Sequence, residues 1–236
     1  MGSSSRLNTI SSLLYSALDE EGEYLYEGEM SSYMRSYALD AAMDLRYLFQ
    51  ASPPTAEEIA YCVQVLSDPE RIKRGGSKAL LLTLRENSRP ILDALANSSD
   101  PALRIFALET SSASTNPLFY SPLYTSIDLT RRLLEDPDEN VRVVALSTEQ
   151  QTIAHNAAYI KSSLQRGGGN PMLDFLSQIL ARLEDPSPRV REEAANVLLR
   201  CATAVGRETL DLLVARENNP AAREILANRR LPGSST

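Results

Sequence analysis

EDPDENVRVVALST (residues 135–148) and EDPSPRVREEAANVL (residues 184–198) carry one pattern: an Asp-Pro turn, an aliphatic-basic pair, then small residues at helical spacing. The same order recurs in SDPERIKRGGSKAL (67–80) and SDPALRIFALET (99–110), and NNPAAREIL (218–226) is a degenerate fifth copy. Aspartate caps helices, and the first helical turn tolerates proline because its missing amide hydrogen would be unpaired there. Each copy therefore predicts the start of a helix.

An amphipathic segment precedes each of the four clear copies. Its apolar residues stand three and four positions apart, as one face of a helix requires. These segments cover 59–66, 91–95, 127–134 and 173–183. In the helix after the turn, small residues let the two helices pack closely: Gly76, Ala107, Ala145 and Ala194. The predicted unit is a helical hairpin.

The composition of the 236-residue chain also favours helices. Leucine and alanine supply 61 residues and the β-branched valine and isoleucine only 19, so residues that lose little rotamer freedom in a helix dominate. The sequence predicts an all-α fold.

The repeated turn resembles that of the HEAT and armadillo class of helical repeats, in which the second helix begins with an Asp-Pro turn and a Val-Arg pair. The closest matches are Asp136-Pro137 with Val141-Arg142 and Asp185-Pro186 with Val190-Arg191. The resemblance implies a right-handed α-solenoid of about five hairpins with a concave interaction face. The copies are irregular, because their basic residues, Lys73, Arg104, Arg142, Arg191 and Arg223, lie 31 to 49 positions apart.

Three regions are expected from this pattern. Residues 55–228 form the repeat array, and residues 229–236 form a disordered tail. Residues 1–54 form an N-terminal helical cap or a divergent first hairpin, because the end of a solenoid needs an element that covers its apolar face.

The candidate partner-binding residues lie in the N-terminal region. Residues 19–29 contain six carboxylates and no basic residue, and seven of the ten tyrosines lie within residues 1–61. Acidic side chains bind basic partners, and tyrosines anchor protein interfaces. The simpler alternatives are a solvated acidic loop and tyrosines that pack within the cap. The candidates are Glu20, Glu21, Glu23, Tyr24, Tyr26, Tyr33 and Tyr37.

The repeated charged residues are interpreted first as structural. Stacked hairpins would bring successive arginines near the aspartates of the turns, where charge-assisted hydrogen bonds join neighbouring repeats. This predicted ladder consists of Asp68, Asp100, Arg104, Asp136, Arg142, Asp185 and Arg191. Anion binding by the arginines is the alternative.

An enzyme is not indicated. His155 is the only histidine and has no carboxylate beside it in the sequence that could orient it for nucleophilic catalysis. Cys62 and Cys201 have no histidine or cysteine at metal-ligand spacing, and Gly75-Gly76-Ser77-Lys78 lacks the glycine and lysine order of a phosphate loop. No catalytic residue, metal or cofactor is predicted.

The net charge and the hydropathy of the chain narrow the classes of partner that it could bind. A net charge of −7 argues against nucleic acid, which needs a basic surface, and no apolar run approaches the length of a membrane span. Two isolated cysteines favour a reducing compartment, with the cytoplasm expected first and the nucleus or an organelle as alternatives. We expect a non-catalytic scaffold or adaptor that binds another protein on the concave face or at the acidic cap. The alternatives are an armadillo-type nucleotide exchange cofactor of a seventy-kilodalton heat-shock chaperone and, less favoured, a HEAT-like DNA glycosylase.

Overall fold

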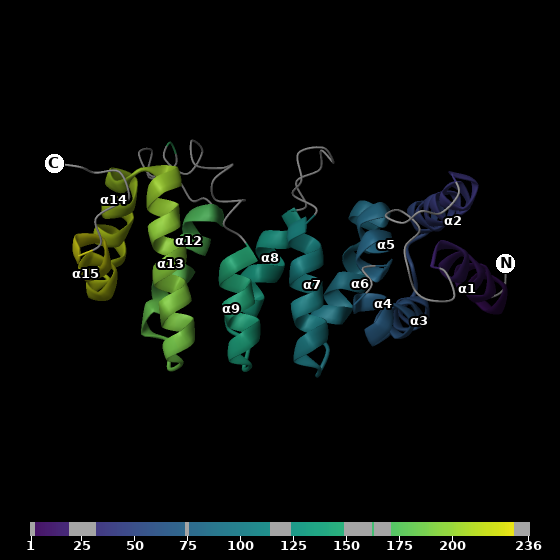
Figure 1. The fold of residues 1–236 in the computed structure, drawn as a ribbon, viewed down its shortest axis with the longest axis horizontal. Helices are drawn as coiled ribbons and strands as arrows, with labels where there is room; N and C mark the ends of the chain where they lie inside the picture. Colours follow the sequence, from purple (N-terminus) through teal and green to yellow (C-terminus); the bar gives the residue numbers. More distant parts are fainter. Residues whose placement is uncertain are drawn as a thin grey trace. The chain divides into compact units, whose positions relative to one another are not determined.

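The computed structural model describes residues 3–18, 32–73, 76–113, 124–148, 162 and 171–228 (Figure 1). Within these residues all regular structure is helical and no strand occurs, so the prediction of an all-α fold is confirmed. The chain forms two compact units, Met1–Leu123 and Tyr124–Thr236. No helix of the described part is both long and apolar enough to cross a membrane.

The first unit contains seven α-helices and one 3-10 helix among its described residues. They are α1 (Ser3–Ala17), α2 (Ser32–Ala51), α3 (Ala56–Leu66), α4 (Pro69–Lys73), α5 (Gly76–Leu84), η1 (Arg85–Ser88), α6 (Arg89–Ala96) and α7 (Pro101–Ala113). Helix α1 packs on α2, and α6 packs on α7. The first helices of successive pairs also touch, α1 with α3 and α3 with α6, as do the second helices, α2 with α5 and α5 with α7.

Apolar side chains fill the spaces between these helices. Leu14 of α1, Leu45 of α2 and Leu66 of α3 are fully buried, as are Leu84 of α5 and Leu95 of α6. Burying each leucine contributes about 1.5 to 3 kcal/mol relative to leaving it in water. The amphipathic spacing of the sequence thus corresponds to apolar side chains buried within this unit.

Residues 1–54 were expected as a cap or a divergent first hairpin. Their described parts, α1 and α2, pack on each other and then on α3 and α5, within the same compact unit. Arg6 of α1 adds polar contacts: its Nη2 donates to the Ser52 carbonyl at 2.6 Å, and its Nε lies 3.4 Å from Glu58 Oε1. Glu58 also closes a capping box with Thr55 at the start of α3.

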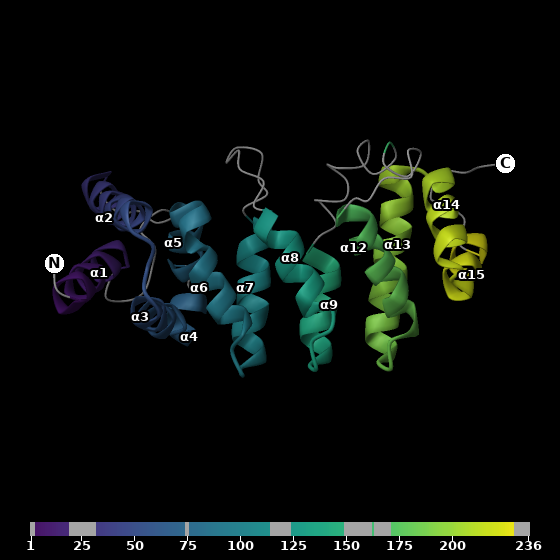
Figure 2. The same cartoon turned by 180° about the vertical axis from the view of Figure 1, so that it is seen from behind.

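The second unit repeats the pairing of helices (Figure 2). Its described elements are α8 (Tyr124–Leu133), α9 (Glu139–Thr148), α12 (Pro171–Ala181), η2 (Arg182–Glu184), α13 (Pro188–Val205), α14 (Arg207–Glu217) and α15 (Pro220–Asn228). The pairs are α8 with α9, α12 with α13, and α14 with α15; α12 also touches α8 and α14, and α13 touches α9 and α15. Within each unit the helix contacts are consistent with a helical repeat. The tail expected at 229–236 lies outside the described residues.

Candidate functional site

The turns that lead into α4, α7, α9 and α13 share one arginine contact. In each, an arginine in the first helical turn extends back and donates from Nη1 to the carbonyl oxygen six residues earlier. The pairs are Arg71 with Val65 at 2.9 Å, Arg104 with Ser98 at 2.8 Å, Arg142 with Asp136 at 2.7 Å, and Arg191 with Asp185 at 2.7 Å. We call these four side chains the anchored arginines. Each of them fastens the start of its own helix to the end of the segment before that helix.

The structure also corrects the alignment of the first copy. Lys73 was assigned the repeated basic position, but Arg71 makes the shared contact. The aliphatic-basic pair of the first copy, Ile72-Lys73, stands two residues beyond the contacting position, because Arg71 itself follows Glu70 and not an aliphatic residue. The side chain of Lys73 lies outside the described residues.

A second correction concerns which residues cap the helices. Asp68 and Asp100 act as expected, since Asp68 Oδ1 accepts from the Glu70 amide at 3.0 Å and Asp100 Oδ1 accepts from the Ala102 amide at 2.9 Å. Asp136 was expected to do the same. Instead Asp138 accepts the amides at the start of α9.

Asp185 differs from the expectation in the same way, because Ser187 caps α13. Asp136 and Asp185 each stand two residues before the cap and accept its backbone amide, both at 2.9 Å. The equivalent residue in the α7 copy is Ser98, whose hydroxyl accepts from the Asp100 amide at 3.1 Å. The Asp-Pro pair at 100–101 is therefore two residues out of register with the pairs at 136–137 and 185–186.

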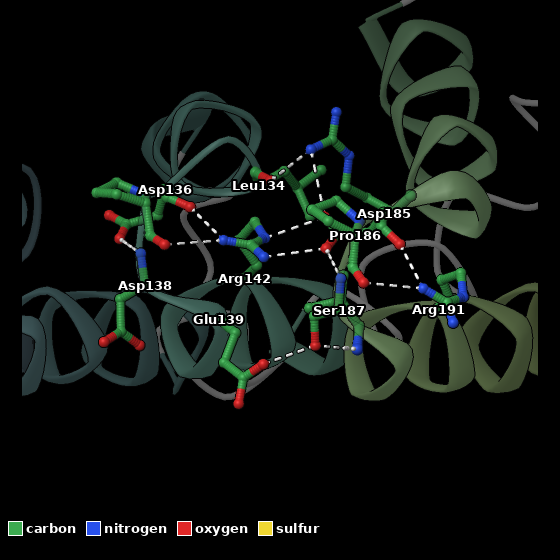
Figure 3. A network of polar contacts seen from close by, with 12 residues as sticks. Leu134, Asp136, Asp138, Glu139, Arg142, Asp185, Pro186, Ser187 and Arg191 are labelled. Atoms are coloured by element: carbon green, nitrogen blue, oxygen red, sulfur yellow. Dashed lines mark hydrogen bonds and ion pairs between the residues drawn. The ribbon is translucent and has the colours of Figure 1, made fainter.

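Arg142 and Asp185 form the central contact of the second unit (Figure 3). Arg142 Nε lies 3.0 Å from Asp185 Oδ2, and Arg142 Nη2 lies 2.9 Å from Asp185 Oδ1. This two-pronged geometry is the strong form of an arginine-carboxylate bond. The exposed fractions of the two residues are 8% and 3%. The pair joins the α9 turn to the α13 turn away from water.

The environment of Asp185 favours its charged form. Burial alone would raise the pKa of Asp185, but hydrogen bonds from Arg142 and the Ser187 amide, with the positive charges of Arg142 and Arg182, outweigh it and lower that pKa. Arg182 Nη1 lies 3.6 Å from Asp185 Oδ2 and donates to the Leu134 carbonyl at 3.3 Å. Asp185 is therefore ionised at neutral pH.

Two further side-chain bonds connect the same turns. Ser187 Oγ donates to Glu139 Oε2 at 2.6 Å, and Arg189 Nη1 donates to Asn140 Oδ1 at 2.5 Å. Together with Arg142 and Asp185 they form a row of three cross-connections between α9 and α13, which Figure 3 shows in part. These bonds hold the two turns together, and the buried charges of Arg142 and Asp185 pair with each other.

Chemistry-bearing groups are sparse in the part of the chain that the structure describes. It contains no group of three or more histidine, cysteine or carboxylate residues that could hold a metal ion. Burial raises the pKa of both thiols to about 12, assisted at Cys62 by the negative charge of Glu58 and opposed at Cys201 by the positive charge of Arg200. His155 lies outside the described residues.

The predicted partner-binding residues are located only in part. Glu20, Glu21, Glu23, Tyr24 and Tyr26 lie outside the described residues. Tyr33 and Tyr37 belong to α2, but their side chains lie outside the described part.

Two other tyrosines belong to the first hairpin, formed by α1 and α2, and they are the most exposed large apolar residues among its described side chains. Tyr15 of α1 is 54% exposed, and Tyr47 of α2 is 57% exposed. The guanidinium carbon of Arg71 lies 5.4 Å from the centre of the Tyr15 ring, within the range of a cation-π contact. Both belong to the tyrosine-rich stretch noted in the sequence, but the sequence could not show which rings face solvent.

Comparisons with protein-family models and with curated protein sequences find no relative of this chain. The likeness to HEAT and armadillo repeats therefore rests on the turns themselves.

Proposed function

We propose that this protein is a non-catalytic adaptor built as a HEAT/armadillo-like α-solenoid, and that it binds a partner protein through the first hairpin. The observation that carries the proposal is the buried contact between Arg142 and Asp185. In this contact, two of the repeated charged residues hold helices together and are not directed at a substrate. The pairing of first with first and second with second helices in each unit supports the repeat architecture.

The first hairpin is the favoured contact surface. Tyr15 and Tyr47 expose more than half of their surface, and tyrosine is enriched among residues that dominate interface energies. The acidic stretch 19–29 follows α1 directly in the sequence. This sequence suits a partner with a basic, partly apolar surface, which the carboxylates of residues 19–29 attract and the exposed rings anchor.

Partner capture tests this proposal. The full chain, immobilised, is compared with a Tyr15→Ala/Tyr47→Ala variant and a Glu20→Lys/Glu21→Lys/Glu23→Lys variant in native lysate at low and moderate salt. Leu212→Ala is the matched control, since Leu212 is 58% exposed but lies on α14 in the second unit. We expect one stoichiometric protein that salt weakens, that both first-hairpin variants lose and that Leu212→Ala retains. Equal capture by all four proteins would overturn the assignment of this surface.

A further inference from the structure

Arg191 repeats the anchoring of Arg142 almost atom for atom. Arg142 Nη1 donates to the carbonyls of Asp136 and Pro137 at 2.7 and 3.1 Å. Arg191 Nη1 donates to the carbonyls of Asp185 and Pro186 at 2.7 and 3.0 Å. One nitrogen is fixed in the same way in both side chains, so the opposite edge, formed by Nε and Nη2, is held in the same orientation relative to its helix.

The two arginines differ in what lies at that edge. In Arg142 it grips the carboxylate of Asp185, whereas in Arg191 no described residue bonds to Nε or Nη2, and the side chain is exposed. Figure 3 shows Arg191 on the far side of the Asp185 turn from Arg142. Arg191 is thus a pre-oriented arginine fork that faces solvent.

We infer that the Nε and Nη2 edge of Arg191 binds a carboxylate of the partner protein, presented by an aspartate of an Asp-Pro turn in the way that Asp185 is presented to Arg142. A planar guanidinium with one nitrogen already fixed loses little freedom when it takes a carboxylate on two prongs. The inference rests on the proposed adaptor function and adds a second contact, of opposite charge to the acidic stretch 19–29.

Glu217 is the competing occupant that the sequence offers within the chain, and its side chain lies outside the described residues. It stands two residues before Asn219, which accepts the Ala222 amide at the start of α15, so it has the register that Asp185 has before Ser187. The backbone between differs, however. Asn218 has a left-handed backbone with φ +51°. The equivalent residue in the turn before α13 is Pro186, whose ring holds φ at about −65°. The backbone of the turn before α15 therefore does not follow the path that places Asp185 against Arg142.

The first test observes Arg191 directly. In the ¹⁵N-labelled full chain, the Arg191 Nε–H resonance is followed while a blocked peptide copying residues 183–190, LEDPSPRV, is added. We expect this resonance to shift on titration, and not to shift when the aspartate of the peptide is replaced by asparagine. No shift at millimolar peptide would overturn the inference. A resonance that moves in Glu217→Gln before any peptide is added would also overturn it, because Glu217 would then fill the edge.

The second test uses the captured partner. Arg191→Lys keeps the charge but loses the two-pronged edge, and we expect its affinity for the partner to fall about tenfold. Arg189→Lys is the matched control, being exposed in the same turn but bonded to Asn140. If the wild-type chain captures no partner, the adaptor proposal fails. If Arg191→Lys binds the partner as tightly as the wild type, only the role of Arg191 fails.

Discussion

Arg142 holds both carboxylate oxygens of Asp185, a residue 43 positions later in the chain, at 3.0 and 2.9 Å. The third nitrogen of the same guanidinium holds the Asp136 carbonyl at 2.7 Å. One side chain therefore closes its own turn and bonds to the next turn. Because both residues are buried, removing Asp185 would leave the charge of Arg142 uncompensated away from water, and removing Arg142 would leave Asp185 with the more distant Arg182 alone.

The stability contributed by Asp185 should depend on pH in one direction. Its pKa is lowered in the folded chain, so its contribution is complete above the unfolded pKa, about 3.9, and is lost as pH falls through the folded value. We expect the difference in unfolding free energy between the wild type and Asp185→Asn to be constant from about pH 5 to 7 and to shrink below about pH 4. Urea denaturation at each pH measures it. A difference that grows on acidification would show that the pKa is raised instead.

The cysteines should be inert while the protein is folded. Burial is the main reason that the pKa of both Cys62 and Cys201 rises to about 12, so only about one thiol in ten thousand is ionised at pH 8. We expect a thiol-specific chromophoric reagent to modify neither in the native protein and both in urea. Rapid modification of the native chain would contradict the burial of these thiols.

Gly206 should resist substitution although space is available. It separates α13 from α14 with φ +89°, and a Cβ built on it meets no atom within 4 Å. Its conformation is one that residues with side chains rarely adopt, at a cost of about 1 to 3 kcal/mol. We expect Gly206→Ala to lower the unfolding free energy by about that amount through backbone strain alone, as measured in urea. Asn218→Gly is the control, because asparagine already tolerates a left-handed φ and the change should be small.

Arg6 should fasten α1 to the rest of the first unit. Arg6→Met removes the bonds to Ser52 and leaves the buried Glu58 without its cation. We expect faster hydrogen exchange across α1 and unchanged exchange in α6, read by mass spectrometry. Arg46→Met is the comparison, since Arg46 pairs at 3.6 Å with Glu86, which is largely exposed. Equal effects of the two substitutions would contradict a special role for Arg6.

The sequence predicted the helices well because their cause is local. Apolar spacing before each turn gave α3, α6, α8 and α12, and the Val-Arg pairs marked the starts of α9 and α13. The register of the turns could not be read in this way. Asp100 and Asp136 look alike in sequence, but Asp100 caps its helix and Asp136 stands two residues before the cap. The difference depends on a second residue in each turn, Ser98 before Asp100 and Asp138 after Asp136, whose side chain also accepts a backbone amide.

The candidate contact surface was harder to predict than the fold. A tyrosine in an amphipathic helix can pack inward or face solvent, and only the neighbouring helices decide. Tyr61 bonds to Ser11 at 2.6 Å inside the first unit, whereas Tyr15 and Tyr47 face outward. The open edge of Arg191 was equally hidden, because its sequence environment matches that of Arg142. What differs is the turn that follows each of them.

The contact between Arg142 and Asp185 joins the α9 turn to the α13 turn, and a double-mutant cycle tests this coupling most directly. Unfolding free energies are measured in urea for the wild type, Arg142→Met, Asp185→Asn and the double variant, with the exposed pair Arg200 and Glu193 as a parallel cycle. We expect each single change at the buried pair to cost about 3 kcal/mol or more and the coupling to exceed about 1.5 kcal/mol. The surface pair should couple by less than about 1 kcal/mol. Coupling between Arg142 and Asp185 no larger than that of the surface pair would show that this contact does not hold the two turns together.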